Sequence, residues 1–319
     1  MTSRPVLEVG GTHVLASRVD AATWRVELGS VHRLPLDSGG TAETILATLA
    51  VCAGRLGLAP PETLAVAIPG PFDYPAGIGR FRGVGKFDAL AGVDVGRALH
   101  DRLAPPPARV AFVNDAEAFG LGEWLAGAAR GYQRAVAITL GTGVGSAFVA
   151  AGRVVAAGPS VPPGGHVHRL ALDGRPLEET VSRRAIVASY RRLVPAARDG
   201  LDVREIAALA RGGDETAARV FSDAFCRLGA ALAPWLARFG AQVLVAGGGL
   251  TASWPLIEPP LRRGLGSMSG DLVIVRSADP AAATSAGAAW HSQAAAGAPA
   301  GPDPGAAPRP LMPAGPGER

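Results

Sequence analysis

The chain has 319 residues, 48% hydrophobic and 18% charged, which is the composition of a globular protein long enough for two domains. Its net charge is +4, but the basic residues are scattered among acidic ones, which argues against a nucleic-acid binder. No apolar stretch is long enough to cross a bilayer, the N-terminus does not resemble a signal peptide, and Cys52 and Cys226 stand far apart, without metal-site spacing. We therefore expect a cytoplasmic protein without nucleic-acid or membrane partners.

The first part of the chain predicts an α/β unit, because short β-branched stretches alternate with segments of helical spacing. The expected strands are residues 6–9, 14–19, 24–28, 64–68 and 110–113. The expected helices are residues 41–56, 95–103 and 116–126. The glycine-rich stretch 72–93 is predicted to be a loop with functional content.

The second part repeats this plan, so we predict two α/β domains, residues 1–113 and 114–295, with the last helix packing back on the first domain. The expected strands are residues 135–139, 147–150, 153–155, 243–246 and 272–275. The expected helices are residues 183–193, 203–209, 214–239, 254–265 and 281–294. Pro234 is expected to break or kink the long helix. Residues 296–319 are mostly Pro, Gly and Ala, and predict a disordered tail.

Two glycine–threonine turns, each following a hydrophobic strand, are the clearest functional signal. Glycine lets backbone N–H groups approach an anion closely, and threonine adds a hydroxyl donor. Two such turns, about 130 residues apart, indicate two halves of a cleft that grips one polyphosphate. Their residues are Gly10, Gly11 and Thr12 in the first turn, and Gly141, Thr142, Gly143 and Gly145 in the second.

Asp115 follows Asn114 at a predicted strand-to-helix junction between the two turns. Taken alone, this position favours a helix N-cap. With Asn114 before it and both turns present, we interpret Asp115 as the base that accepts a hydroxyl proton during phosphoryl transfer.

Six segments resemble, in order, those of ROK-family sugar kinases and bacterial glucokinases, members of the hexokinase/actin-like ATPase superfamily. The resemblance covers about residues 5–293. It implies an α/β protein of two actin-like ATPase (ribonuclease H-like) domains with a cleft between them. The segments are Leu7-Glu8-Val9-Gly10-Gly11-Thr12, Ile68-Pro69-Gly70-Pro71, Asn114-Asp115-Ala116, Leu140-Gly141-Thr142-Gly143-Val144-Gly145, Gly165-His166-Val167 and Ala246-Gly247-Gly248-Gly249-Leu250.

The resemblance also implies ATP and Mg²⁺ as cofactors. It assigns the nucleotide to Glu8 and both turns, with Gly247, Gly248 and Gly249 lining the adenosine. The alternative for these three glycines is a closely packed turn. The resemblance assigns the sugar to Asn114, Asp115, His166 and Glu178. The alternatives are a structural role for His166 and a helix-start acid for Glu178.

Several positions depart from the family pattern. The zinc-binding cysteines are missing, so no structural zinc site is expected. Glu8 replaces the aspartate of the first turn, and Pro163 replaces a sugar-binding glutamate. The loop 72–93 lacks the usual Asn-Leu-Pro-Gly-Trp-like run and carries charged residues instead, which suit either an amino sugar or a solvated loop: Arg80, Arg82, Lys86 and Asp88.

The leading interpretation is an ATP:hexose 6-phosphotransferase acting on glucose or an amino-glucose such as kanosamine. The alternatives are an N-acetylmannosamine kinase, a non-catalytic ROK-type sugar-sensing regulator, and another activity of the superfamily such as an acyl-phosphate kinase or ATPase chaperone. Regulators carry a helix-turn-helix domain before the first turn, and only five residues precede Val6 here. Family members often form dimers, so a homodimer is expected.

Overall fold

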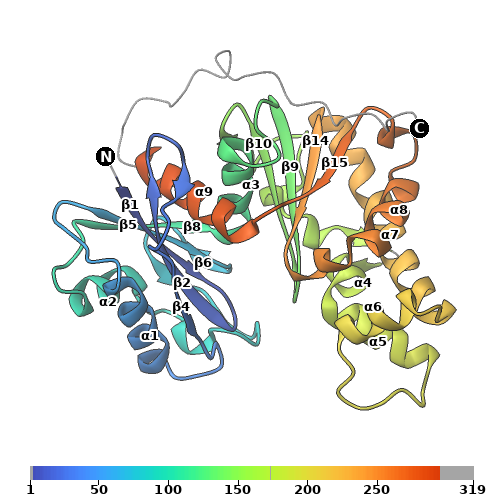
Figure 1. Ribbon diagram of the computed structural model, residues 1–319, viewed down its shortest axis with the longest axis horizontal. Helices are drawn as coiled ribbons and strands as arrows, with labels where there is room; N and C mark the ends of the chain where they lie inside the picture. Colours follow the sequence, from blue (N-terminus) through green and yellow to red (C-terminus); the bar gives the residue numbers. More distant parts are fainter. Residues whose placement is uncertain (1–2, 173, 295–319) are drawn as a thin grey trace.

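The computed structural model describes residues 3–172 and 174–294, and the predicted tail lies outside them. Two lobes, each built on its own mixed sheet, lie side by side (Figure 1). Among the described residues, no helix is both long enough and apolar enough to span a membrane.

The N-terminal sheet has the order β3-β2-β1-β5-β8, and β4 also pairs with β2. β1 pairs antiparallel with β2, whereas β1, β5 and β8 run parallel, so their carboxyl ends meet at one edge. Helices α1 (Ala42–Gly54) and α2 (Val95–Arg102) belong to this lobe. The strands are β1 (Ser3–Val9), β2 (His13–Asp20), β3 (Arg25–Val26), β4 (His32–Pro35), β5 (Thr63–Ile68) and β8 (Arg109–Asn114).

The C-terminal sheet repeats this arrangement in the order β11-β10-β9-β14-β15. β9 and β10 form the antiparallel pair, and β9, β14 and β15 run parallel. The strands are β9 (Arg134–Leu140), β10 (Val144–Ala150), β11 (Arg153–Val154), β14 (Val243–Gly247) and β15 (Val273–Arg276). The helices on the outer side of this lobe are α4 (Glu178–Val181), α5 (Arg183–Leu193), α6 (Val203–Arg211), α7 (Glu215–Phe239) and α8 (Trp254–Leu265).

Two helices each follow a strand of one lobe and pack on the sheet of the other lobe. α3 (Asp115–Ala126) leaves β8 and packs on β9 and β10, whereas α9 (Pro280–Ala294) leaves β15 and packs on β1 and β5. The two helices also pack against each other between the sheets (Figure 1). Their backbones meet so closely that a Cβ on Gly122 would lie 1.7 Å from the carbonyl oxygen of Ala283, and a Cβ on Gly287 would lie 1.8 Å from that of Ala118. Glycine is therefore required where the lobes are joined.

Three local expectations differ from the structure. α7 continues through Pro234 without a break, because nine buried side chains along the helix anchor both halves to the core of its lobe. Residues 32–35 form β4 although their pattern does not predict a strand. The loop 72–93 contains a small hairpin, β6 (Phe72–Asp73) with β7 (Ile78–Gly79).

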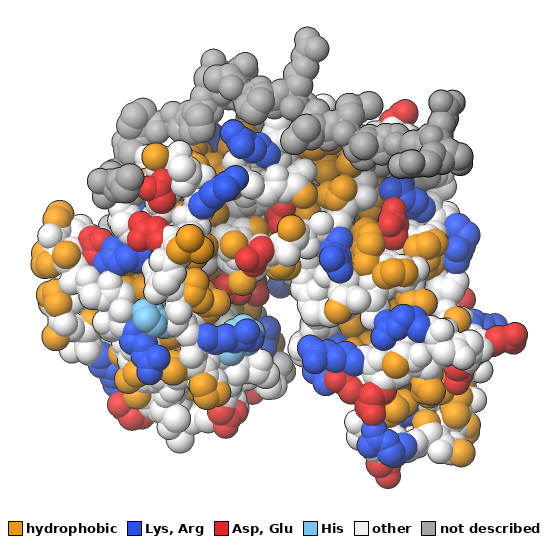
Figure 2. All heavy atoms as spheres, viewed as in Figure 1, with side chains coloured by type: hydrophobic (Ala, Val, Ile, Leu, Met, Phe, Trp, Pro, Cys, Tyr) orange, Lys and Arg blue, Asp and Glu red, His pale blue; other side chains and the backbone are white. Residues whose placement is uncertain are grey.

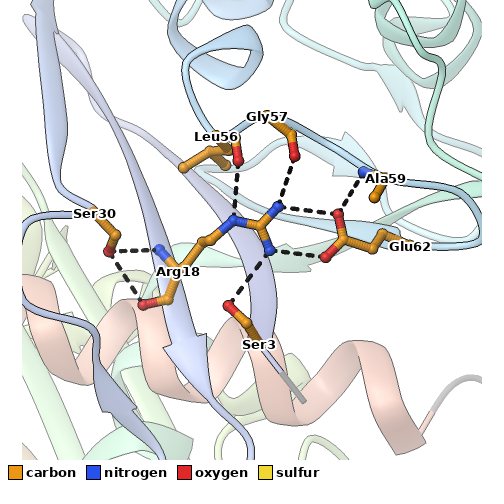
Figure 3. A network of polar contacts seen from close by, with 7 residues as sticks. All are labelled: Ser3, Arg18, Ser30, Leu56, Gly57, Ala59 and Glu62. Atoms are coloured by element: carbon orange, nitrogen blue, oxygen red, sulfur yellow. Dashed lines mark hydrogen bonds and ion pairs between the residues drawn. The ribbon is translucent and has the colours of Figure 1, made fainter. Parts of the chain in front are cut away.

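A half-buried ion pair ties β2 to the segment that connects α1 with β5 (Figure 3). Arg18 donates two hydrogen bonds to the Glu62 carboxylate, at 2.7 and 3.0 Å. The same guanidinium donates to the carbonyl oxygens of Leu56 and Gly57. Planar bidentate pairing of this kind fixes geometry as well as charge.

Candidate active site

The first glycine turn and Asp115 lie at the same edge of the N-terminal sheet. In the register of the parallel strands, Glu8 is opposite Ala67, and Asn114 is opposite Ile68. The turn connects β1 to β2 and is closed by a hydrogen bond from the N–H of Gly10 to the carbonyl oxygen of His13, at 2.9 Å. The end of β1 and the start of α3 are therefore neighbours.

Carboxyl groups gather at this edge. Burial and the negative charge of Asp115 raise the pKa of Glu8 to about 8, with a smaller opposing effect of Arg33. Burial also raises the pKa of Asp115, and the positive charge of Lys86 opposes that shift. The pKa of Glu117 is raised by burial and by Asp115. The Oε2 atom of Glu8 is buried and has no hydrogen-bond partner among the described residues.

Asn114, and not Asp115, caps α3. Its Oδ1 atom accepts hydrogen bonds from the N–H groups of Ala116 and Glu117, at 3.0 and 3.2 Å. Its Nδ2 atom donates to the hydroxyl of Tyr74 at 2.9 Å. Asp115 is the first residue of the helix, where its Oδ1 atom accepts from the N–H of Ala116. Asn114 therefore fills the N-cap position that the sequence also allowed for Asp115.

The second glycine turn reaches the same helix start from the other lobe. A Cβ on Gly145 would lie 2.7 Å from the Cβ of Ala116, immediately after Asp115. The third glycine cluster stands beside this turn, because Gly247 pairs with Thr139 and a Cβ on Gly248 would lie 2.5 Å from the carbonyl oxygen of Leu140. Gly248 is thus closely packed, as expected from the alternative interpretation that the three glycines form a packed turn.

Open space remains next to two glycines of these segments. Apart from the adjoining backbone, no atom of the described residues lies within 4 Å of a Cβ built on Gly141 or Gly249. Backbone next to open space can be approached closely by a ligand. In the space-filling view, the two lobes are separated by a cleft that opens toward the lower edge of the picture (Figure 2).

His166 lies in a tight turn of the C-terminal lobe that Ser146 holds in place. The hydroxyl of Ser146 donates to the carbonyl oxygen of Gly165 at 2.5 Å and accepts from the N–H of Val167 at 3.0 Å. The rings of His166 and His168 are 5.2 Å apart. Burial lowers the pKa of His166, and so do the charges of His168 and Arg169, which favours the neutral form of the ring.

Glu178 stands against the second turn. Its Oε2 atom accepts from the N–H of Val144 at 3.3 Å, and its Oε1 atom accepts from Arg184 at 3.4 Å. Its charge also acts on His168. The structure therefore brings Glu178 together with the second turn and the histidine segment, whereas Asn114 and Asp115 belong to the N-terminal edge.

The donors present fit the expected nucleotide and metal. Mg²⁺ prefers carboxylate oxygens and usually keeps several waters, so it needs few protein ligands. The buried Oε2 atom of Glu8, which has no partner among the described residues, would be available as such a ligand. No group of three or more His, Cys, Asp or Glu side chains in the described part of the chain is arranged to hold a metal ion.

Sequence reasoning missed two supporting residues. Tyr74 lies in the stretch 72–93 and becomes a neighbour of Asn114 only because the β6–β7 hairpin folds back. Ser146 is a polar residue inside an apolar strand, and this signal could have indicated a buried structural hydroxyl.

Comparisons with known proteins identify the family and the fold. The model of the ROK family matches residues 6–289. A glucokinase of Thermotoga maritima is 27% identical over 219 residues, which are 62% of this chain and 67% of that protein. The bifunctional enzyme NanE/NanK of Brucella melitensis is 28% identical over 66% of this chain and 35% of its own length.

The fold is also similar to that of a solved structure. The crystal structure of a ROK hexokinase from Thermus thermophilus superposes with a TM-score of 0.71 at 26% identity, covering 91% of this chain and 97% of that one. The expected fold of two actin-like ATPase domains is confirmed.

Proposed function

The chain belongs to the ROK family, and from this premise we propose that it is a sugar kinase that transfers the γ-phosphoryl group of ATP to the 6-hydroxyl of a hexose. The observation that supports the proposal best is that both glycine turns lie close to the start of α3. The charge of Asp115 acts on Glu8 of the first turn, and a Cβ on Gly145 of the second turn would lie 2.7 Å from the Cβ of Ala116. These observations support a base at Asp115, between the two turns that we propose to bind the phosphates.

Each group has a distinct task in the proposed reaction. The backbone donors of both turns hold the phosphates, and Gly247–Gly249 line the nucleoside. Glu8 would hold Mg²⁺, which would offset the charge of the phosphates. Asp115 accepts the proton of the sugar hydroxyl as a bond forms between that oxygen and the γ-phosphorus, while the bond from phosphorus to the β,γ-bridging oxygen breaks and ADP leaves.

The proposed acceptor is glucose or an amino-glucose such as kanosamine. Asn114, His166 and Glu178 are the proposed sugar ligands, together with Asp115. Of the charged residues in the loop 72–93, Arg80 is paired with Asp73 at 2.8 Å, and Asp88 accepts from the N–H of Val84 at 3.2 Å. The exposed side chain of Asp88 is the group that would meet an ammonium substituent. The homodimer and the cytoplasmic location stay predictions.

The test is ADP formation by the purified protein with ATP, Mg²⁺ and a panel of glucose, mannose, kanosamine, glucosamine and N-acetylmannosamine. We expect turnover with at least one sugar, and a loss of about a thousandfold or more in Asp115→Asn with sugar binding retained. The matched control is Asp94→Asn, the same change at the N-cap of α2 in the same lobe, where asparagine caps equally well.

Near-normal turnover of Asp115→Asn contradicts its role as the base. Binding of a sugar without ADP formation from any member of the panel favours the sugar-sensing regulator instead.

A further inference from the structure

The carboxylate of Glu178 lies directly against the second glycine turn. Its Oε2 atom accepts a hydrogen bond from the N–H of Val144 at 3.3 Å. A Cβ on Gly143 would lie 2.7 Å from the same oxygen and 3.2 Å from the carboxyl carbon, so the carboxylate fills the space that a side chain at Gly143 would need. An acidic group thus occupies one side of a turn whose N–H groups suit an anion.

The backbone that carries Glu178 is anchored, whereas its side chain is held weakly. Leu177 and Val181 of the same segment are fully buried in the core of the C-terminal lobe, and the N–H of Leu177 donates to the carbonyl oxygen of Leu170 at 2.7 Å. The side chain of Glu178 is 31% exposed and that of its partner Arg184 is 73% exposed, so this ion pair contributes little. The carboxylate can therefore change rotamer without a movement of α4.

This arrangement prevents the second turn from offering all of its donors to a phosphate. The proposed function assigns the N–H groups of the turn to the phosphates and assigns Glu178 to the sugar. The N–H of Val144 has a single hydrogen, which it cannot donate fully to Glu178 and to a phosphate oxygen at the same time. A phosphate beside the turn would also be repelled by the negative charge of Glu178.

We infer that the carboxylate of Glu178 is a gate of the phosphate site, which occupies the N–H of Val144 until a sugar draws it away. The inference rests on the proposed function, in which Glu178 binds sugar hydroxyls. When these hydroxyls donate to Glu178, the carboxylate turns from the second turn, and the N–H of Val144 is released to a phosphate oxygen. Sugar and nucleotide then favour each other's binding to the same extent. Without sugar, the gate weakens the binding of ATP and so limits its hydrolysis.

The gate can be tested without sugar and without catalytic activity. The probe is inorganic triphosphate with Mg²⁺, and its dissociation constant is measured by calorimetry for the unsubstituted protein, Glu178→Ala and Glu179→Ala. Because a competing hydrogen bond and a like charge are removed, Glu178→Ala should bind the probe about five- to tenfold more tightly than the unsubstituted protein. Glu179→Ala is the matched control, since Glu179 is an exposed acid of the same helix, and it should bind the probe like the unsubstituted protein.

Equal or weaker binding of triphosphate by Glu178→Ala overturns the inference. Glu178→Gln keeps the size of the side chain without its charge, so it should show a smaller gain in affinity, and no gain in either variant has the same consequence. If the probe binds to none of the proteins, the second turn is not a phosphate site, and the proposed function is overturned as well.

The effect of the sugar on nucleotide binding tests the release of the gate. A saturating concentration of the sugar that supports turnover should tighten the binding of the ATP analogue AMPPNP, with Mg²⁺, to the unsubstituted protein and to Glu179→Ala. Glu178→Ala should bind AMPPNP tightly already, and the sugar should add little. A sugar effect of the same size in Glu178→Ala overturns the inference. If no sugar supports turnover, the proposed function fails, and the triphosphate measurement still decides whether Glu178 closes the phosphate site.

Discussion

The side-chain amide of Asn114 donates a hydrogen bond to the hydroxyl of Tyr74 at 2.9 Å, and that hydroxyl donates in turn to the carbonyl oxygen of Ile68 at 3.3 Å. The chain of bonds joins the ends of β5 and β8 to the β6–β7 hairpin. It fixes the orientation of an amide whose Oδ1 atom already caps α3. One N–H of Asn114 is thereby committed to the protein, and in the proposed function the other would donate to the sugar.

Tyr74→Phe should weaken sugar binding more than it slows the chemical step. Loss of the hydroxyl frees the Asn114 amide to rotate, and one lost hydrogen bond of about 1 kcal/mol corresponds to a roughly fivefold higher KM for the sugar. The measurement is the KM and kcat for the best sugar of the panel. Tyr132→Phe is the control, because the contact of Tyr132 with Trp124 uses its backbone carbonyl. Equal KM values for Tyr74→Phe and the unsubstituted protein contradict this role.

The crossing of α3 and α9 should be intolerant of even one methyl group. In Gly287→Ala, the new Cβ would overlap the backbone of Ala118, so the helices must separate, and overpacking of this kind costs about 1–3 kcal/mol. Denaturant unfolding measures the loss. The control is Gly54→Ala at the end of α1, where the nearest atom, Leu103 Cδ2, is 4.0 Å away. An unfolding free energy of Gly287→Ala equal to that of the control would show that the crossing is not tightly packed.

The elements with strong periodicity were predictable from the sequence. α5 and α8 begin and end at the predicted residues, and the parallel strands are found within one residue of their predicted bounds, except β1, which begins three residues earlier than predicted. Local sequence could not predict β4, because its strand conformation depends on pairing with β2. The assignment of the helix cap to Asn114 and not Asp115 depends on side-chain geometry that two adjacent polar residues leave open.

The candidate site was predictable as a set of segments but not as an arrangement. The motifs indicated that both glycine turns and Asp115 act together, and the register of β1, β5 and β8 explains why the first turn lies beside Asp115. The pairing of Glu178 with the N–H of Val144 could not be read from the sequence, since 34 residues separate the two. Long-range side-chain contacts of this kind arise only from the packed fold.

The ion pair between Arg18 and Glu62 should contribute measurably to stability. Both side chains are about one-fifth exposed, and the pair forms two charge-assisted hydrogen bonds (Figure 3). Glu62→Gln leaves the guanidinium with a weaker partner, and we expect a loss of about 1–2 kcal/mol in the free energy of unfolding. The control is Glu43→Gln, because Glu43 pairs with Arg102 at an exposed site where such pairs contribute little. Similar values for the two variants contradict the prediction.

Glu8 should make the protein less stable as the pH rises. In the unfolded chain, Glu8 ionises near its ordinary pKa of 4.5, whereas in the folded protein its pKa is about 8, so the folded state holds an extra proton between these values. The slope of the unfolding free energy with pH is proportional to the protons bound in the unfolded state minus those in the folded state, and it is therefore negative in this window. One such proton gives a slope of at most about 1.4 kcal/mol per pH unit.

Glu8→Gln removes this proton difference, so the variant should gain stability relative to the unsubstituted protein as the pH is raised from about 5 to about 8. The measurement is denaturant unfolding of both proteins, without Mg²⁺ or nucleotide, across that range. Parallel curves for Glu8→Gln and the unsubstituted protein would mean that Glu8 is ionised in the fold. A gain in stability together with a loss of kinase activity would show that Glu8 is retained for binding metal and phosphate at a cost in stability.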